Sequence, residues 1–589
     1  MEPTKAGLTP AGKVVVFLVV VAMIGGGAFL LRDTIFPQGS DSGTKPVDIE
    51  GFKKTASGGS EAETSETGGK AVESPDLAGI TTAKEYKYVP AEKLPPVKGV
   101  SNYKFEDKTV VFPINMWIGW LPIVAANKGF KPNEESVFFK KHGFKVALKL
   151  IDDPVAARDA YAAGESHVLW GTLDMIVLFA GDLMKDSRTA PRVLQQIDWS
   201  SGGDGIVVRD SIKSVRDLKG KTIVYAQNSP SQYYINSLLL TAGIQPASVK
   251  HKYTASAFEA AAAFVADKSI DACVSWAPDI YNIPDRVAGT RILSTTADAN
   301  RLITDVYAVR ADFAKDHPEI VKGLVDGIFE GMTEVAKDPA AAFQALAEGY
   351  SLPLEEVKGM AADAFTTNFA ENKQFFLNAN NPTNFERTWK TISYVYRELG
   401  LIASPIPFDQ VMDFSVIQAL EKEGAFQDQL MAPAKSFVAT DFKKLSAEAP
   451  ILTQTIQINF FPNSANLKEP ARDEFGNRVQ GKLYDPNVDA TLERVFRLAG
   501  QFSNARIAIV GHTDGSKKGQ IPFDDVRELS QQRAEAVKQA LLKTYPDAFS
   551  PNKFTVEGAG WNVPADPADP MNHAKNRRVE ISVYQPESE

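Results

Sequence analysis

Polar and aromatic side chains gather where the predicted strands of the central part of the chain end. The residues at these ends are Trp117, Gly119, Trp120, Thr172, Asp174, Ser201, Ser229, Ser231, Gln232, Trp276 and Asp279. Small ligands of open α/β sheets bind beyond the carboxyl ends of the strands. Hydroxyls and the backbone N–H groups of helix starts suit an oxyanion. The pattern therefore predicts a pocket for a small solute.

Each of these residues also has an ordinary structural interpretation. A tryptophan beside a strand end fills core, and Thr172, Ser229 and Ser231 fit plain helix N-caps. Five of the seven tryptophans lie at or next to the strand ends, and this shared placement favours the pocket. Nothing in the sequence names the solute.

The elements that position these residues lie between residues 101 and 425. Short apolar runs, such as residues 108–115, 146–151 and 272–276, alternate with amphipathic helical stretches. This alternation predicts a parallel α/β architecture. This alternation of strands and helices occurs twice, which predicts two lobes. From about residue 311 the pattern becomes mainly helical.

Several motifs in this region resemble the periplasmic solute-binding proteins of the nitrate, taurine and aliphatic-sulfonate type. They are NMWIGWLP at residues 115–122, KGF at 128–130, VRDLKGK at 215–221 and VSWAP at 274–278. The resemblance implies a two-lobed periplasmic-binding-protein fold that closes on a small solute. It also implies an ABC permease as the membrane partner.

The last region, residues 451–589, alternates strands and helices as a small α/β sandwich does. It carries GHTD at residues 511–514, LSQQRA at 529–534 and NRR at 576–578. These three motifs, in this order, resemble the OmpA-like peptidoglycan-binding domain.

The OmpA-like resemblance implies a ligand, the diaminopimelate of the peptidoglycan stem peptide. By motif, Asp514 takes its ammonium group and Arg533 its carboxylate, with Thr513, Asn576 and Arg577 beside them. A carboxylate and a guanidinium a few ångströms apart match the two charges of an amino acid. The alternative is that Asp514 caps a turn and pairs internally with Arg533.

The N-terminal region predicts a membrane anchor followed by a linker. Residues 14–31 are uncharged and apolar, close to the length that crosses a bilayer. Lysines in residues 1–13 place that end in the cytoplasm. A cleaved signal peptide is the alternative. Residues 32–100 are rich in small and polar residues and predict a disordered linker, and residues 426–450 predict a second linker.

Composition and motifs exclude several classes of function. The net charge of −9 argues against nucleic-acid binding. Cys273 is the only cysteine, and the six histidines show no metal-ligand spacing. There is no nucleophile elbow or phosphate loop. We therefore predict no enzyme activity, no metal and no cofactor.

The sequence supports two hypotheses of function. The first is an envelope protein, single-pass in the inner membrane of a Gram-negative bacterium with its bulk in the periplasm, that presents a solute to an ABC transporter or sensor. The second is a wall-anchored structural or stator-like protein whose central region docks a protein partner. Residues 14–31 contain no acidic residue of the kind that conducts protons in stators, which favours a plain anchor.

Overall fold

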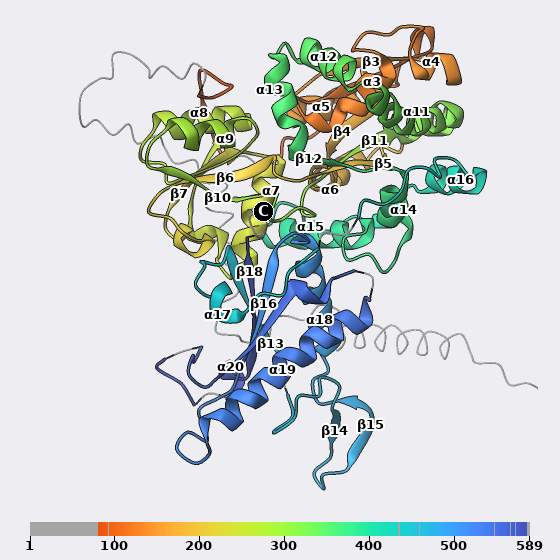
Figure 1. Ribbon diagram of the computed structural model, residues 1–589. Coiled ribbons are helices and arrows are strands. Elements are labelled where there is room, and N and C mark those ends of the chain that lie inside the picture. Colours follow the sequence, from red (N-terminus) through yellow and green to blue (C-terminus); the bar gives the residue numbers. More distant parts are fainter. Residues whose placement is uncertain are drawn as a thin grey trace, which may run out of the picture.

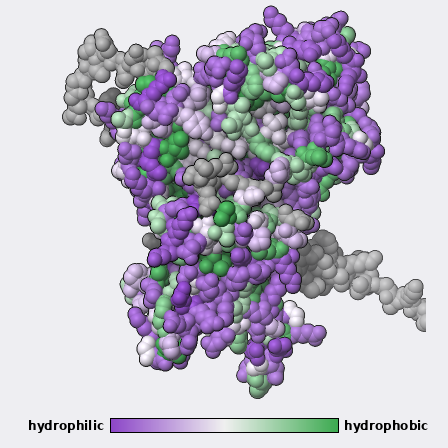
Figure 2. Space-filling model, in the orientation of Figure 1, coloured by the Kyte–Doolittle hydropathy of each residue, from purple (hydrophilic) through white to green (hydrophobic). Residues whose placement is uncertain are grey.

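The computed structural model describes residues 80–585 apart from 92–93, 434–435, 459, 547, 566 and 572. The predicted N-terminus 1–13, the predicted membrane helix 14–31 and most of the predicted linker lie outside the described residues. Within the described residues, no helix is both long enough and apolar enough to cross a membrane. The chain forms two α/β lobes above a C-terminal domain (Figure 1). The face drawn in Figure 2 is mostly hydrophilic.

Lobe one comprises residues 94–200 and 304–433. Its four-stranded sheet has the order β12 (Ala364–Thr366), β5 (Pro191–Ser200), β11 (Thr304–Arg310), β4 (Val168–Thr172), and β2 (Thr109–Ile114) pairs with β3 (Lys145–Leu150). Its helices are α3 (Leu121–Asn127), α4 (Val137–His142), α5 (Pro154–Ala162), α6 (Leu173–Leu183), α10 (Ala311–Asp316), α11 (Pro318–Lys337), α12 (Pro339–Tyr350), α13 (Leu354–Gly359), α14 (Phe369–Leu377), α15 (Phe385–Glu398) and α16 (Ser415–Glu423). Short 3-10 helices η1 (Glu106–Lys108), η2 (Ile118–Trp120), η5 (Met360–Asp363) and η6 (Phe408–Gln410) join them. The sheet lies within the core, because β4 and β11 are buried along their whole length.

Lobe two comprises residues 80–91 and 204–295. Its six-stranded sheet has the order β1 (Tyr88–Val89), β8 (Lys250–Thr254), β7 (Thr222–Ala226), β9 (Ala272–Trp276), β6 (Asp204–Arg209), β10 (Thr290–Thr295). Its helices are α7 (Pro230–Thr241), α8 (Ala257–Ala266), α9 (Asp279–Arg286), η3 (Val215–Leu218) and η4 (Pro246–Ser248). Two segments connect the lobes: the first crossover, residues 201–203, and the second crossover, residues 296–303.

The six-stranded sheet of lobe two is mixed and the four-stranded sheet of lobe one is antiparallel, whereas the sequence pattern predicts parallel sheets. Strands β2–β3, β7–β8 and β7–β9 pair in parallel, but β6 pairs antiparallel with β9 and β10, and β11 pairs antiparallel with β4 and β5. The crossovers explain the difference. Strand β6 leads into lobe two and β10 leads back, so these neighbours run in opposite directions, and the same holds for β5 and β11.

The predicted linker ends earlier than residue 100. Residues 80–91 lie on lobe two, where β1 adds an edge strand by pairing with β8. Thr82 donates from its N and Oγ1 to Asp279 Oδ1 at 2.8 and 2.7 Å. Composition does not reveal this strand, because its order comes from pairing with residues far along the chain.

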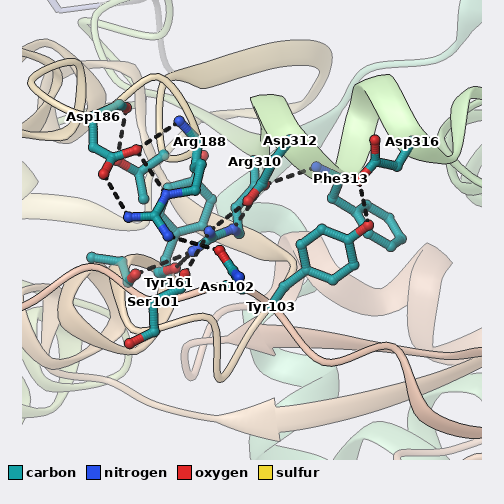
Figure 3. A network of polar contacts seen from close by, with 12 residues as sticks. Ser101, Asn102, Tyr103, Tyr161, Asp186, Arg188, Arg310, Asp312, Phe313 and Asp316 are labelled. Carbon is teal, nitrogen blue, oxygen red and sulfur yellow. Dashed lines mark hydrogen bonds and ion pairs between the residues drawn. The ribbon is translucent and has the colours of Figure 1, made fainter.

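Arg310 at the end of β11 contacts the first residues of lobe one, near Ser101, and so links them to the sheet (Figure 3). This buried guanidinium donates to the main-chain oxygens of Tyr161 and Ser101, at 2.5 and 2.9 Å, and pairs with Asp312 at 2.8 Å. Arg188 next to it donates to Asn102 Oδ1 at 2.7 Å. The network ties four separate segments of lobe one together, those around residues 101, 161, 188 and 310.

Replacing Arg310 by leucine should destabilise lobe one by about 3–5 kcal/mol, because it removes the buried donor to the main-chain oxygens of Tyr161 and Ser101 and the ion pair with Asp312. Urea unfolding followed by tryptophan fluorescence measures the loss. Arg188→Leu is the matched control, since its partly exposed ion pair is worth less than about 1 kcal/mol. Equal effects of the two substitutions would contradict the role given to burial.

The C-terminal domain has a four-stranded sheet of order β13 (Leu452–Gln457), β18 (Arg578–Tyr584), β16 (Arg506–His512), β17 (Phe554–Gly560). Helices α18 (Val488–Gln501) and α19 (Phe523–Thr544) pack with it, and α17 (Phe442–Leu445), η7 (Pro551–Lys553) and α20 (His573–Asn576) are short. The hairpin of β14 (Pro470–Arg472) and β15 (Arg478–Leu483) projects away from the sheet (Figure 1).

The C-terminal domain touches the second crossover directly. Arg301 N donates to Gln501 O at 3.1 Å, and Asn300 Oδ1 accepts from Ser503 Oγ at 3.0 Å and from Asn504 N at 3.1 Å. Buried Lys553 stabilises this contacting loop, because its Nζ donates to the main-chain oxygens of residues 502, 503 and 505.

Candidate functional site

Trp117 spans the junction between the lobes. It follows β2 of lobe one, and its indole Nε1 donates to Asp198 Oδ2 at 2.8 Å. Its ring lies against the first crossover, since a Cβ on Gly203 would stand 2.3 Å from Trp117 Cη2. Gly119 also permits a close approach, because a Cβ there would overlap Asp198 Oδ2.

Cross-strand pairing aligns polar side chains on one face of the lobe-one sheet. Asp305 of β11 pairs with Thr172 of β4 on one side and with Asp198 of β5 on the other. Paired residues of antiparallel strands point to the same face. The row Thr172, Asp305, Asp198 therefore presents two carboxyl groups and a hydroxyl together.

Lobe two brings Asp204 and Trp276 to the same junction. They are cross-strand partners of β6 and β9, so their side chains share a face. Asp204 Oδ2 accepts from Ser200 Oγ at 2.7 Å, and Trp276 belongs to a small apolar cluster against which Met116 of lobe one packs. Trp276 Nε1 is buried and has no hydrogen-bond partner among the described residues.

Five carboxyl groups are buried at this junction, each no more than 6% exposed. They belong to Asp174, Asp198, Asp204, Asp305 and Asp363. Burial raises the pKa of Asp198 and of Asp204 to about 7, and the pKa of Asp174 and of Asp363 to about 6. Burial and the neighbouring Asp198 raise the pKa of Asp305 further.

The structure brings together most of the residues predicted for the solute site. Trp117, Gly119 and Thr172 lie at the junction as described, and Asp174 Oδ2 accepts from Tyr396 OH at 2.9 Å. Ser201 lies in the first crossover, where its N donates to Asp363 O at 2.7 Å.

Other predicted residues serve the local structure. Trp120 is a core residue that donates from Nε1 to Asn115 Oδ1 at 2.7 Å. Asp279 holds Thr82, as described above. At the start of α7, Ser229 Oγ donates to Ala226 O, and Gln232 Oε1 accepts from Asn228 N. Ser231 is buried beside them, and its Oγ has no partner among the described residues.

Asp198, Asp204, Asp305 and Asp363 were not predicted from the sequence. A usable signal was present, because Asp198 stands between Ile197 and Trp199 in β5 and Asp305 directly precedes the apolar residues of β11. An acid inside a buried strand is rare without a functional or structural partner.

Gly203→Ala should displace Trp117 and destabilise the lobes by about 1–3 kcal/mol, because the added methyl group overlaps the indole ring. The fall in melting temperature and a red shift of tryptophan emission measure this. Gly181→Ala in α6 is the control, since a Cβ there meets no atom within 4 Å and a helix favours alanine. An unchanged Gly203→Ala protein would contradict the packing.

Asp514 and Arg533 lie in the C-terminal domain as the motifs predict. Asp514 follows β16, and its Oδ2 accepts from Arg577 Nε at 2.6 Å and lies 3.0 Å from His573 Nδ1. Although burial raises the pKa of Asp514, hydrogen bonds from Ser516, His573 and Arg577 outweigh it and hold that pKa below its usual range.

Arg533 of α19 is buried over the ring of Phe460, 4.9 Å from its centroid, and its Nε donates to Ser464 O at 3.1 Å. Burial, then the nearby Arg577, lowers the pKa of Arg533 to about 10. Among the described residues no hydrogen-bond acceptor meets its Nη groups. The structure thus pairs Asp514 with Arg577. Among the described residues, the two Nη groups of Arg533, here called its fork, remain without an acceptor.

The remaining predicted residues of this domain frame the same place. Thr513 N donates to Gly560 O at 2.9 Å, which joins β16 to the end of β17. Asn576 is buried and its Oδ1 accepts from Ala565 N at 2.8 Å, so it shapes the adjacent loop. His573 was not predicted, although its position four residues before Arg577 on a helical turn is the signal that places both on Asp514.

Comparisons with known proteins match the two regions separately. Residues 123–342 match the family model described as NMT1/THI5 like, and residues 459–578 match the OmpA family. Proteins named as binding proteins in Brucella abortus (strain 2308) and Brucella suis biovar 1 (strain 1330) are 23% identical over 221 residues. That alignment covers 36% of this chain and only 62% of theirs.

Two solved structures are similar to part of this chain. The aliphatic sulphonate binding protein SsuA from Escherichia coli is 16% identical with a TM-score of 0.41, covering 56% of this chain and 97% of its own. The nitrate-binding protein NrtA from Synechocystis PCC 6803 is 15% identical with a TM-score of 0.40, covering 54% of this chain and 89% of its own.

Proposed function

For a chain that joins an NMT1/THI5-like domain to an OmpA-family domain, we propose a peptidoglycan-bound envelope protein that captures a small solute between its two lobes. One observation carries the solute site. Buried polar groups from both lobes converge on the crossovers, and Asp204 Oδ1 and Trp276 Nε1 have no hydrogen-bond partner among the described residues. Buried polar atoms are normally paired, so such a group of unpaired ones supports a ligand.

The C-terminal domain holds the peptidoglycan stem peptide in this proposal. The open fork of Arg533 suits the carboxylate of a diaminopimelate end, with two parallel charge-assisted hydrogen bonds. Asp514 takes the ammonium group of the same end. Arg577 and His573 keep Asp514 ionised until the ligand arrives.

We further propose that residues 14–31 anchor the chain in the inner membrane, so that the lobes stand in the periplasm beside an ABC permease or sensor. Apolar length and flanking lysines support the anchor. Two tethers, one in the membrane and one in the wall, raise the local concentration of the lobes near a membrane partner.

Thermal unfolding of the full chain against a panel of compounds tests the solute site. The panel contains sulfonates, nitrate, phosphate, carboxylates and amines. A compound present at 100 times its dissociation constant stabilises the protein by about 2.7 kcal/mol. We expect a saturable shift with one class, absent from Gly203→Ala and kept by Gly181→Ala. No shift with any class would overturn solute capture and favour the protein-docking hypothesis.

A further inference from the structure

The junction between the lobes is acidic and contains no described cation. Lobe one supplies Asp174, Asp198, Asp305 and Asp363, and lobe two supplies Asp204. Within the described residues, no salt bridge reaches any of these five carboxyl groups. Arg301 of the second crossover lies instead over the rings of Trp199 and Phe365.

Few donors satisfy these carboxyl groups. Trp117 Nε1 donates a hydrogen bond to Asp198, Ser200 Oγ donates to Asp204, and Tyr396 OH donates to Asp174. Asp198 and Asp305 share a hydrogen bond, and one oxygen of Asp204 has no donor among the described residues. Acceptors therefore outnumber donors, which is the arrangement that a ligand rich in N–H groups completes.

Two further buried groups point to the same place. Thr172 is 3% exposed, its pairing with Asp305 puts it on the face of the acidic row, and its hydroxyl lowers the pKa of Asp174 by hydrogen bonding against the effect of burial. Trp276 is 8% exposed, its Nε1 is unpaired, and it shares a face with Asp204. These groups lie outside the acidic cluster and converge on it from the two lobes.

The charge of the junction selects among ligands. A sulfonate or nitrate here would meet like charges in a poorly hydrated site, which costs several kcal/mol. A cation would be attracted by the same carboxylates, and the indole of Trp117 offers it an aromatic face. Tyr281 adds a second ring, whose OH donates to Gly202 O at 2.8 Å beside Asp363.

We propose that the solute bound at this junction is a small organic cation, an ammonium or amidinium group held by Asp198 and Asp204 across the two lobes. This inference rests on the proposed function and gives it a substrate class. The class is opposite in charge to sulphonate and nitrate, the ions named for the two solved structures above.

Cation binding at this site should depend on pH. The titratable groups that face Asp198 and Asp204 are all acidic or phenolic: Asp174, Asp305, Asp363, Tyr234 and Tyr281. A cation binds the ionised carboxylates, and Asp198 and Asp204 both ionise near pH 7. Affinity should therefore rise about tenfold or more between pH 6 and pH 8.

Isothermal titration of the full chain tests the proposal. The probes are ethylammonium, guanidinium and agmatine as chlorides, against ethanesulfonate and nitrate as sodium salts, at pH 6 and pH 8. We expect heat from at least one cation, stronger at pH 8, and none from the anions. Asp198→Asn and Asp204→Asn should each weaken the cation at least tenfold.

The control is Asp107→Asn, which removes the same charge from an exposed residue at the opposite end of β2 and should leave affinity unchanged. Binding of the anions alone would overturn the cation class while leaving solute capture intact. No heat from any probe would overturn both. Cation binding that survives both junction substitutions would overturn the assigned residues.

Discussion

At pH 8 the Asp204→Asn protein should melt at a higher temperature than the native protein. The pKa of Asp204 is about 7 in the folded protein, because burial outweighs its hydrogen bond from Ser200, and 3.8 is the value without burial. The folded state therefore holds a proton between pH 4 and pH 7 that the unfolded state releases. Stability contributed by this group is complete below pH 4 and is lost as pH rises to 7.

The size of this loss is about 4 kcal/mol, since the two pKa values lie about three units apart and each unit corresponds to about 1.4 kcal/mol. Asparagine carries no charge, so it removes the loss at pH 8 and changes little at pH 4. Thermal unfolding at the two pH values measures the difference, with Asp107→Asn as the exposed control. A substitution that stabilises equally at both pH values would contradict the assigned ionisation.

A stabilising substitution in a binding site follows from conflicting demands. In the proposed site the carboxylate destabilises the empty lobes and would be retained because the ligand requires it, a trade-off common in functional sites. The pair of measurements on Asp204→Asn, higher stability with weaker cation binding, would separate this role from a purely structural one. A structural carboxyl group would lose stability when replaced.

Arg533→Met should reduce binding of the full chain to peptidoglycan by about 10- to 100-fold, because it removes two charge-assisted hydrogen bonds to the ligand carboxylate. Methionine keeps the apolar contact with Phe460, so the domain should stay folded. Co-sedimentation with purified peptidoglycan over a range of protein concentrations gives the affinity.

Arg527→Met is the matched control for this substitution. Arg527 lies on the same helix, but its side chain is 54% exposed and it pairs with Glu557 on the surface. Its replacement should leave peptidoglycan binding near the native value. Equal losses in both variants would indicate a general effect of positive charge. They would contradict specific binding of the ligand carboxylate by the Arg533 guanidinium.

The sequence predicted the two lobes and the C-terminal sandwich because their periodicity is local. It also placed Trp117, Thr172 and Trp276 near one site, since strand ends meet at one edge of a sheet. It missed Asp198 and Asp305, because the rule applied to parallel strands and these acids lie on antiparallel ones. Their alignment depends on a register between β5 and β11, which are about a hundred residues apart.

The C-terminal domain also contains side-chain pairings that the sequence could not predict. Its motifs predict Asp514 and Arg533 as ligand contacts from sequence alone. The pairing of Asp514 with Arg577 and His573 depends on how the loop before β18 folds back, a tertiary contact that no local pattern encodes.

The contact of the C-terminal domain with Asn300 and Arg301 couples the rotation of the lobes to the placement of the C-terminal domain. Rotation of one lobe relative to the other must turn the second crossover, and with it the loop of residues 501–504. If solute capture changes the lobe angle, its free energy is shared with the placement of the C-terminal domain. Reciprocity then requires that attachment to the cell wall alter solute affinity by the same factor by which solute alters attachment. The wall would in this way act as an effector of the lobes as well as their anchor.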